Sequence, residues 1–150
     1  MNRLLHPSAL LCCALLSACS DLSGAWVGTC DFSSGSTTLT GGLDLKITEG
    51  KGNGIGGEVK LAVSDGRDFA GDLEGVRADS SVELSGNVLE RLSEEDSGVD
   101  TGGVAATGGD PFSFSLEGRL EGEEDVLVGT CVFGVPGGTG GLTGELRLQR

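Results

Sequence analysis

The side chains of this sequence that are best suited to covalent or acid–base chemistry are five cysteines and one histidine. Four of these residues lie in or directly after an apolar segment at the start of the chain: His6, Cys12, Cys13 and Cys19. The other two, Cys30 and Cys131, lie far apart in the matching contexts Val-Gly-Thr-Cys-Asp-Phe and Val-Gly-Thr-Cys-Val-Phe. A thiol can act as a nucleophile or be oxidised to a disulfide, and a histidine serves as a base or a zinc ligand. Which chemistry applies depends on the role of the apolar segment.

The first 18 residues have the composition of a secretory signal peptide: one arginine is followed by an apolar run too short to span a bilayer as a permanent helix. The run ends in Leu16-Ser17-Ala18-Cys19, which resembles the lipobox of bacterial lipoproteins. The resemblance implies cleavage before Cys19 and acylation of its thiol by groups such as palmitate. Small residues suit this site because the peptidase must take an extended backbone close to its catalytic centre. A plain secretory signal, in which Cys19 plays no part, is the alternative.

The chain that follows the signal segment is predicted to be one small acidic domain, residues 19–150. Removing 18 of the 150 residues leaves 132, enough for a single core. Because one arginine and no acid leave with the signal, 9 basic and 23 acidic residues remain, a formal charge of −14. Such a surface repels nucleic acid and anionic headgroups, so the membrane must be reached through acyl chains on Cys19. In lipoproteins of this type, an aspartate directly after the lipidated cysteine often retains the protein at the inner membrane. Here Ser20 takes that position, which favours the outer membrane. The domain would then face the periplasm or the cell surface.

The same cleavage decides the remaining cysteine chemistry. With a lipidated Cys19 set aside, Cys30 and Cys131 are the thiols left in an oxidising compartment, and we expect a disulfide between them. Two free buried thiols are the alternative. The single histidine, His6, leaves with the signal, so no Ser-His-Asp triad, Cys-His dyad or typical zinc site remains. Acids and lysines fall on predicted outer faces or in turns, and we therefore predict no catalytic residue, no metal and no cofactor.

One pattern recurs from Leu22 onward: an apolar residue, any residue, glycine, any residue, an apolar residue. It occurs eight times, centred on Gly24, Gly41, Gly57, Gly71, Gly86, Gly118, Gly129 and Gly144. Since side chains alternate along a strand, the apolar residues and the glycine share one face and polar residues fill the other. Eight such strands predict a small antiparallel up-and-down β-barrel, in which inner glycines relieve crowding and permit coiling. A β-sandwich is the alternative.

Residues 93–110 interrupt this pattern with an acidic stretch followed by one rich in glycine and alanine. A segment of this length, charge and composition is predicted to be a flexible loop. Calcium binding is the rival interpretation, but Asp96 and Asp100 lack the spaced Asp, Gly and Glu of an EF-hand loop.

The first predicted strand contains Gly24-Ala25-Trp26, which resembles the Gly-x-Trp motif of the calycin barrels, the lipocalins and avidin-like proteins. Residues 112–133 and the last residues of the chain are similar to the closing strands of avidin-like barrels. The resemblance implies that a basic residue near the end packs over Trp26 at the barrel floor. Strand alternation selects Arg150 for this role, and Trp26 is then a core plug rather than a ligand contact. Biotin binding is not implied, because the chain has one tryptophan and no tyrosine.

Two functions remain open. The first is a membrane-anchored envelope lipoprotein with a non-catalytic structural or protein-interaction role, whose acidic outer face or 93–110 loop meets another envelope protein. The alternative is a lipocalin-like binding module whose lumen takes a small apolar ligand. Filled cores are the commoner outcome in small domains, and this favours the first.

The predicted disulfide conflicts with the predicted barrel. In a closed eight-stranded barrel the last strand lies between the first and the seventh, which separates Cys30 from Cys131 by roughly 9–10 Å. A disulfide requires Cα atoms within about 7 Å. Either the last strand is displaced near the cysteines, or they meet across a flattened lumen, or the strand count is wrong by one.

Overall fold

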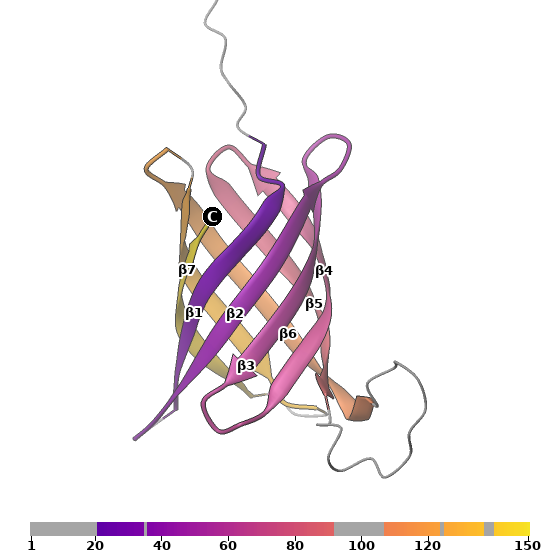
Figure 1. Ribbon diagram of the computed structural model, residues 1–150, viewed down its shortest axis with the longest axis vertical. Helices are drawn as coiled ribbons and strands as arrows, with labels where there is room; N and C mark the ends of the chain where they lie inside the picture. The colour runs from indigo at the N-terminus through magenta and orange to yellow at the C-terminus, as the bar shows by residue number, and fades with distance from the viewer. Residues whose placement is uncertain (1–20, 35, 92–106, 124, 137–139) are drawn as a thin grey trace, which may run out of the picture.

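The computed structural model describes residues 21–34, 36–91, 107–123, 125–136 and 140–150. The chain forms eight antiparallel strands that close into one barrel (Figure 1): β1 Gly24–Ser34, β2 Thr37–Glu49, β3 Gly54–Val63, β4 Asp68–Ala78, β5 Ser81–Arg91, β6 Thr107–Glu121, β7 Val126–Gly134 and β8 Gly141–Gln149. Each strand pairs with the next in sequence, and β8 pairs with β1. The predicted up-and-down barrel is confirmed, and the β-sandwich alternative is wrong. In the described part of the chain, no helix has the length and apolar character of a membrane span.

Apolar and polar residues alternate along each strand, and this alternation builds the core. In β2, buried Leu43 and Leu45 alternate with exposed Asp44 and Lys46. All eight strands contribute buried apolar side chains in the same way, and these side chains form a single cluster inside the barrel. The period of two therefore decides which residues fill the lumen.

Glycines lie on the inner face where a neighbouring strand folds closely over the chain. A Cβ on Gly28 would overlap the Arg147 carbonyl and approach Leu148 Cα to 2.9 Å. A Cβ on Gly129 would likewise lie 2.5 Å from Gly118 Cα. Since both obstacles are backbone, no side chain is tolerated there, and the inner glycines allow the sheet to coil into a narrow barrel.

Strand β6 begins at Thr107, so the last four residues of the predicted 93–110 loop belong to a strand instead. The pairing continues because the register shifts between Val88 and Glu90, after which Glu90 lies opposite Gly108. Pro111 falls within this irregularity, where its missing N–H costs no ladder hydrogen bond. The rest of the predicted loop, including Asp96 and Asp100, lies outside the described residues.

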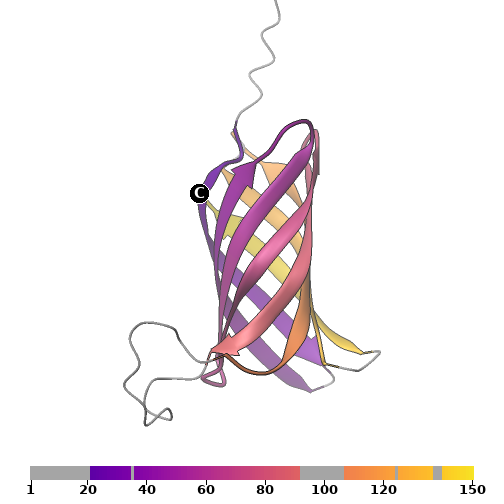
Figure 2. The same ribbon diagram turned by 90° about the vertical axis from the view of Figure 1, so that its right-hand side faces the viewer.

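The two ends of the barrel differ in what they carry. The β2–β3, β4–β5 and β6–β7 connections lie at one end, together with Asp21 and Arg150 (Figures 1 and 2). We call this the N-terminal end. The β1–β2, β3–β4, β5–β6 and β7–β8 connections lie at the other end, which we call the phenylalanine end.

Candidate functional site

At the N-terminal end the structure brings together Trp26 and Arg150. Trp26 is fully buried, and its indole Nε1 donates a hydrogen bond to the Leu22 carbonyl at 3.0 Å. The Arg150 guanidinium carbon lies over the indole, 5.3 Å from the ring centroid. The same guanidinium donates to the Asp21 carbonyl at 2.5 Å. Trp26 therefore plugs this end of the lumen, with Arg150 between the ring and the incoming chain.

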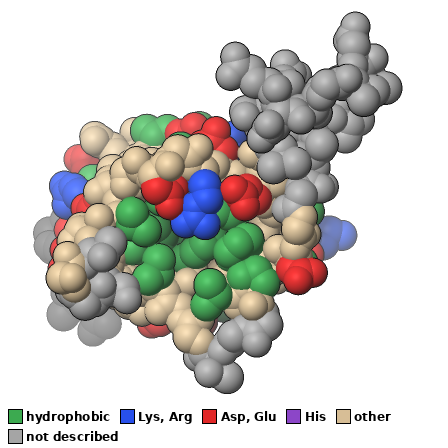
Figure 3. Space-filling model, turned by 90° about the horizontal axis from the view of Figure 1, so that it is seen from below, with side chains coloured by type: hydrophobic (Ala, Val, Ile, Leu, Met, Phe, Trp, Pro, Cys, Tyr) green, Lys and Arg blue, Asp and Glu red, His purple; other side chains and the backbone are tan. Residues whose placement is uncertain are grey.

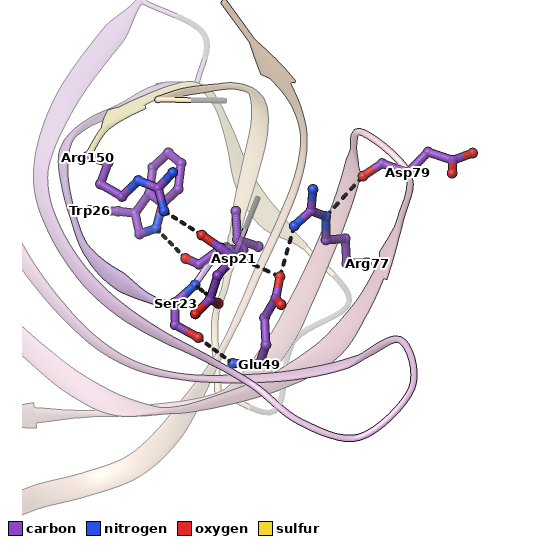
Figure 4. A network of polar contacts seen from close by, with 8 residues as sticks. Asp21, Ser23, Trp26, Glu49, Arg77, Asp79 and Arg150 are labelled. Carbon is purple, nitrogen blue, oxygen red and sulfur yellow. Dashed lines mark hydrogen bonds and ion pairs between the residues drawn. The ribbon is translucent and has the colours of Figure 1, made fainter. Parts of the chain in front are cut away.

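A network of polar contacts ties the start of β1 to the turns around it (Figure 4). The Glu49 carboxylate accepts from the Leu22 N–H and from the Arg77 guanidinium, both at 2.9 Å. The Glu49 N–H in turn donates to the Ser23 hydroxyl at 3.0 Å. Hydrogen bonds from Ser23 also lower the pKa of the Asp21 carboxyl. The backbone from Asp21 to Ser23 precedes the paired residues of β1 and is thus held by hydrogen bonds that involve side chains.

The sequence analysis did not single out Glu49 or Arg77. They are 28 residues apart and lie at the ends of different strands, so no spacing rule pairs them. Only the barrel register, which places the β2–β3 and β4–β5 turns at the same end, makes them neighbours.

Cys30 and Cys131 form a disulfide, with their Cα atoms 6.3 Å apart and both side chains fully buried. Strand β8 lies between them and stays paired to both β1 and β7, so it is not displaced and the strand count is right. On β8, Leu146 lies opposite Cys30 and Gly144 opposite Cys131.

The Cα–Cα distance of 6.3 Å is about two thirds of the distance across two strand spacings in a flat sheet. The sheet therefore curves sharply around β8. A Cβ on Gly144 would lie 2.7 Å from the Asp31 carbonyl oxygen, so β1 and β8 approach each other closely beside the disulfide. The disulfide and the closed barrel are therefore compatible, because the lumen is narrow at this strand.

Four phenylalanines converge at the other end of the barrel, from strands β1, β4, β6 and β7: Phe32, Phe69, Phe112 and Phe133. Phe69, Phe112 and Phe133 contact one another with ring centroids 4.9 to 5.1 Å apart. Phe112 is only half-buried, as are Leu39 and Leu142 beside the core. Seen end-on, apolar side chains gather here around a basic side chain flanked by acidic ones (Figure 3).

Arg67 lies above this cluster, with its guanidinium carbon 5.6 Å from the centroid of the Phe69 ring. Its guanidinium donates to the Asp65 carboxylate at 2.7 and 2.9 Å. This hydrogen-bonded pair lowers the pKa of Asp65 and raises that of Arg67. The carboxylate of Glu90 also raises the pKa of Arg67. The phenylalanine end therefore combines an apolar surface with the Arg67 cation, which is held between acids.

The lumen between the two ends is packed. The largest fully buried side chains include Trp26, Phe69 and Phe114, and the disulfide crosses the interior. Among the described residues, every buried side chain is apolar, and no three acidic, cysteine or histidine side chains are placed to hold a metal ion. The surfaces left for recognition are the two ends and the outer face.

The predicted lipidation site, Leu16, Ser17, Ala18 and Cys19, lies outside the described residues.

No protein-family model matches the sequence, and no curated protein matches it. Two solved structures resemble the fold. One is a redesigned beta barrel, mFAP1, bound to DFHBI, with a TM-score of 0.57 and 13% identity over 86% of this chain and 94% of that one. The other is EF1p2_mFAP2b bound to DFHBI, with a TM-score of 0.58 and 12% identity over 86% and 93% of the two chains. At such identity the likeness establishes a small antiparallel barrel and nothing about activity.

Proposed function

We propose that this chain is a lipid-anchored envelope protein of the bacterial outer membrane whose calycin-like barrel is a non-catalytic module for protein contacts. The observation that carries the proposal is the packed lumen. Trp26 plugs one end, Phe69 lies near the other, and the Cys30–Cys131 bond crosses the interior. A core filled in this way leaves the outer surface as the part that meets other molecules.

The N-terminal end supports the anchoring part of the proposal. Leu22 is buried and hydrogen-bonded to Glu49, and Arg150 donates to the Asp21 carbonyl. Ser20 is the one residue between Asp21 and Cys19. Acyl chains on Cys19 would therefore hold the barrel close to the membrane by this end.

Metabolic labelling with an alkyne analogue of palmitate tests the anchor. We expect the full chain to be labelled and to co-sediment with outer membranes on a density gradient. Cys19→Ser should abolish labelling and release the protein to the soluble fraction. Cys13→Ser is the matched control and should change neither. An unlabelled wild-type chain, or labelling that persists in Cys19→Ser, would contradict the proposal.

A second candidate function is the binding of a small apolar ligand at the phenylalanine end. Half-buried Phe112, Leu39 and Leu142 offer it a partly open apolar surface. Both similar barrels were solved with the small molecule DFHBI bound. If this candidate is right, native mass spectrometry of the Cys19→Ser chain from its host should show an adduct that is lost on denaturation. Phe112→Ala should reduce the adduct, and Val27→Ala, on the outer face, should not. A bare mass in the native spectrum rejects it.

A further inference from the structure

One row of outward-facing side chains crosses seven strands in register. It runs from β2 through β1, β8, β7, β6 and β5 to β4: Thr40, Asp31, Glu145, Thr130, Glu117, Glu83 and Val76. All seven are exposed, four are acidic and none is basic. Asp31 lies directly opposite Glu145, and Glu83 directly opposite Glu117. Like charges in such positions repel, so the row costs the isolated barrel some stability.

Four of the seven residues of this row line a groove on the outer face of β4 to β7. The groove has a volume of about 260 Å³, and its lining includes Glu74, Glu83, Glu117, Val76 and Val132. Two short side chains, Ser85 on β5 and Ser115 on β6, lie opposite each other in its lining.

The groove combines exposed apolar surface with negative charge. Val76 is 49% exposed and Val132 38% exposed, although both lie within strands rather than in turns. The three glutamates carry charges that no described ion pair offsets. In the described residues these acids are too dispersed to hold a metal ion. Glu83 and Glu117 lie on β5 and β6, between Val76 on β4 and Val132 on β7, so the complement is an extended or helical segment with lysine or arginine between two apolar residues.

The closed barrel restricts how such a segment can bind. Every strand is paired on both sides, so a partner cannot add a strand to an edge and must instead use its side chains. The formal charge of −13 would attract a basic partner from a distance and speed its association.

We propose that the groove over β4 to β7 binds a basic segment of another envelope protein. Its lysines or arginines pair with the acids of the groove, Glu83 and Glu117 in the middle and Glu74 beside them. Apolar side chains on either side of these bases cover Val76 on β4 and Val132 on β7. This assignment rests on the interaction role proposed above and specifies its surface and the chemistry of the partner.

The test uses a synthetic nine-residue peptide with central lysines and a leucine on each side of them, added to the ¹⁵N-labelled Cys19→Ser chain. We expect amide shifts to concentrate on β4 to β7 around the groove. A second peptide with glutamate in place of lysine should cause none. The affinity of the basic peptide should fall about fivefold or more between 50 and 300 mM salt, because exposed charge pairs are screened.

A charge-matched pair of variants separates the groove from the general acidity of the surface. Glu83→Gln with Glu117→Gln should weaken the basic peptide about tenfold, a loss typical of removing two contacting charges. Asp31→Asn with Glu145→Gln removes the other opposed acidic pair of the same row, outside the groove, and should change the affinity less than about twofold. Both double variants relieve repulsion and keep the side-chain shape, so both should melt at or above the wild-type temperature.

Three results overturn the groove assignment: no binding of the basic peptide, equal losses in the two double variants, or shifts centred on the phenylalanine end. None of them bears on acylation, since the labelling of Cys19 is measured separately. Conversely, a wild-type chain that is not labelled but whose groove still binds the peptide would contradict the proposed lipid anchor. It would leave the groove assignment valid.

Discussion

The Arg150 side chain joins three parts of the molecule. Its guanidinium covers the Trp26 indole, donates to the Asp21 carbonyl and makes a 3.4 Å ion pair with Asp125. Trp26 and Asp21 belong to the first residues of the barrel, and Asp125 lies just before β7. Arg150 thus holds the segment that leads into β1 in place.

Arg150→Gln should lower the free energy of unfolding by about 1 to 2 kcal/mol, because the cation–π contact and its hydrogen bonds are lost together. Trp26 is the sole tryptophan, so its fluorescence emission should shift in the same variant. Arg147→Gln is the control, since Arg147 is exposed on the outer face of the same strand. Equal stability and emission in the two variants would show that Arg150 does not support Trp26.

Gly28 shows why several inner positions accept no side chain. A methyl group there would lie on the Arg147 carbonyl, and Gly28→Ala should therefore cost about 2 kcal/mol or more. Gly140→Ala adds the same methyl group where nothing lies within 4 Å, and it should change the stability little. Urea denaturation of both variants measures the difference. If the Gly28→Ala protein is as stable as wild type, the neighbouring strand β8 can shift to make room for the methyl group.

At the scale of the element, the β3–β4 turn has its own stabilising contacts. Gly66 adopts a φ of 93°, and its N–H donates to the Val63 carbonyl at 2.9 Å. Asp65 accepts from both the backbone and the side chain of Arg67. The turn thereby holds Arg67 over Phe69.

Acidification should weaken this turn. The hydrogen bonds from Arg67 lower the pKa of Asp65 in the folded protein. Its stabilising contribution is therefore complete above the pKa of an unfolded aspartate and is lost as the pH falls through the lower, folded pKa. An NMR titration of the Asp65 carboxyl should give a midpoint below that of an ordinary aspartate, and Arg67→Gln should raise it.

Arg119→Gln, which removes an arginine from the outer face of β6, is the control for this titration. It should leave the Asp65 midpoint unchanged. A midpoint that moves equally in both variants would indicate a general effect of net charge.

The strands themselves were predictable from the sequence, because alternation along a strand depends only on local spacing. The alternation of apolar and polar residues identified the inner glycines, the eight strands and the side of the sheet on which Arg150 lies. The start of β6 was not predictable, since the pairing of Gly108 with Glu90 requires a register shift that composition does not reveal. The meeting of Phe69, Phe112 and Phe133 also depends on the register of the closed barrel, to which no short motif points.

At the scale of the whole molecule, the disulfide joins β1 to β7 across 101 residues. Sequence reasoning predicted the pair but placed its members too far apart, because strand spacings in a flat sheet overestimate distances across a sharply curved one. The bond encloses most of the described chain in a covalent loop.

Removing this bond should destabilise the barrel strongly. On a chain-entropy model, a loop of this length contributes about 4 to 5 kcal/mol. Urea denaturation of Cys30→Ala with Cys131→Ala should show a loss of that order. The reduced wild-type chain, which keeps both sulfur atoms, separates the covalent effect from the cavity left by the substitutions. A loss below about 1 kcal/mol in the reduced chain would contradict a major role for the bond.

The tie between Asp21 and the barrel has a geometric consequence for the anchoring proposed above. If Cys19 carries the proposed lipid, one residue separates it from the fixed backbone at Asp21, and the barrel would stand upright on the membrane instead of swinging on a tether. Strands of this length, tilted as in small barrels, give a height of roughly 25 Å. The domain would then act as a spacer of fixed height. It would present its phenylalanine end to whatever lies at that distance from the bilayer and its acidic groove to neighbours standing beside it.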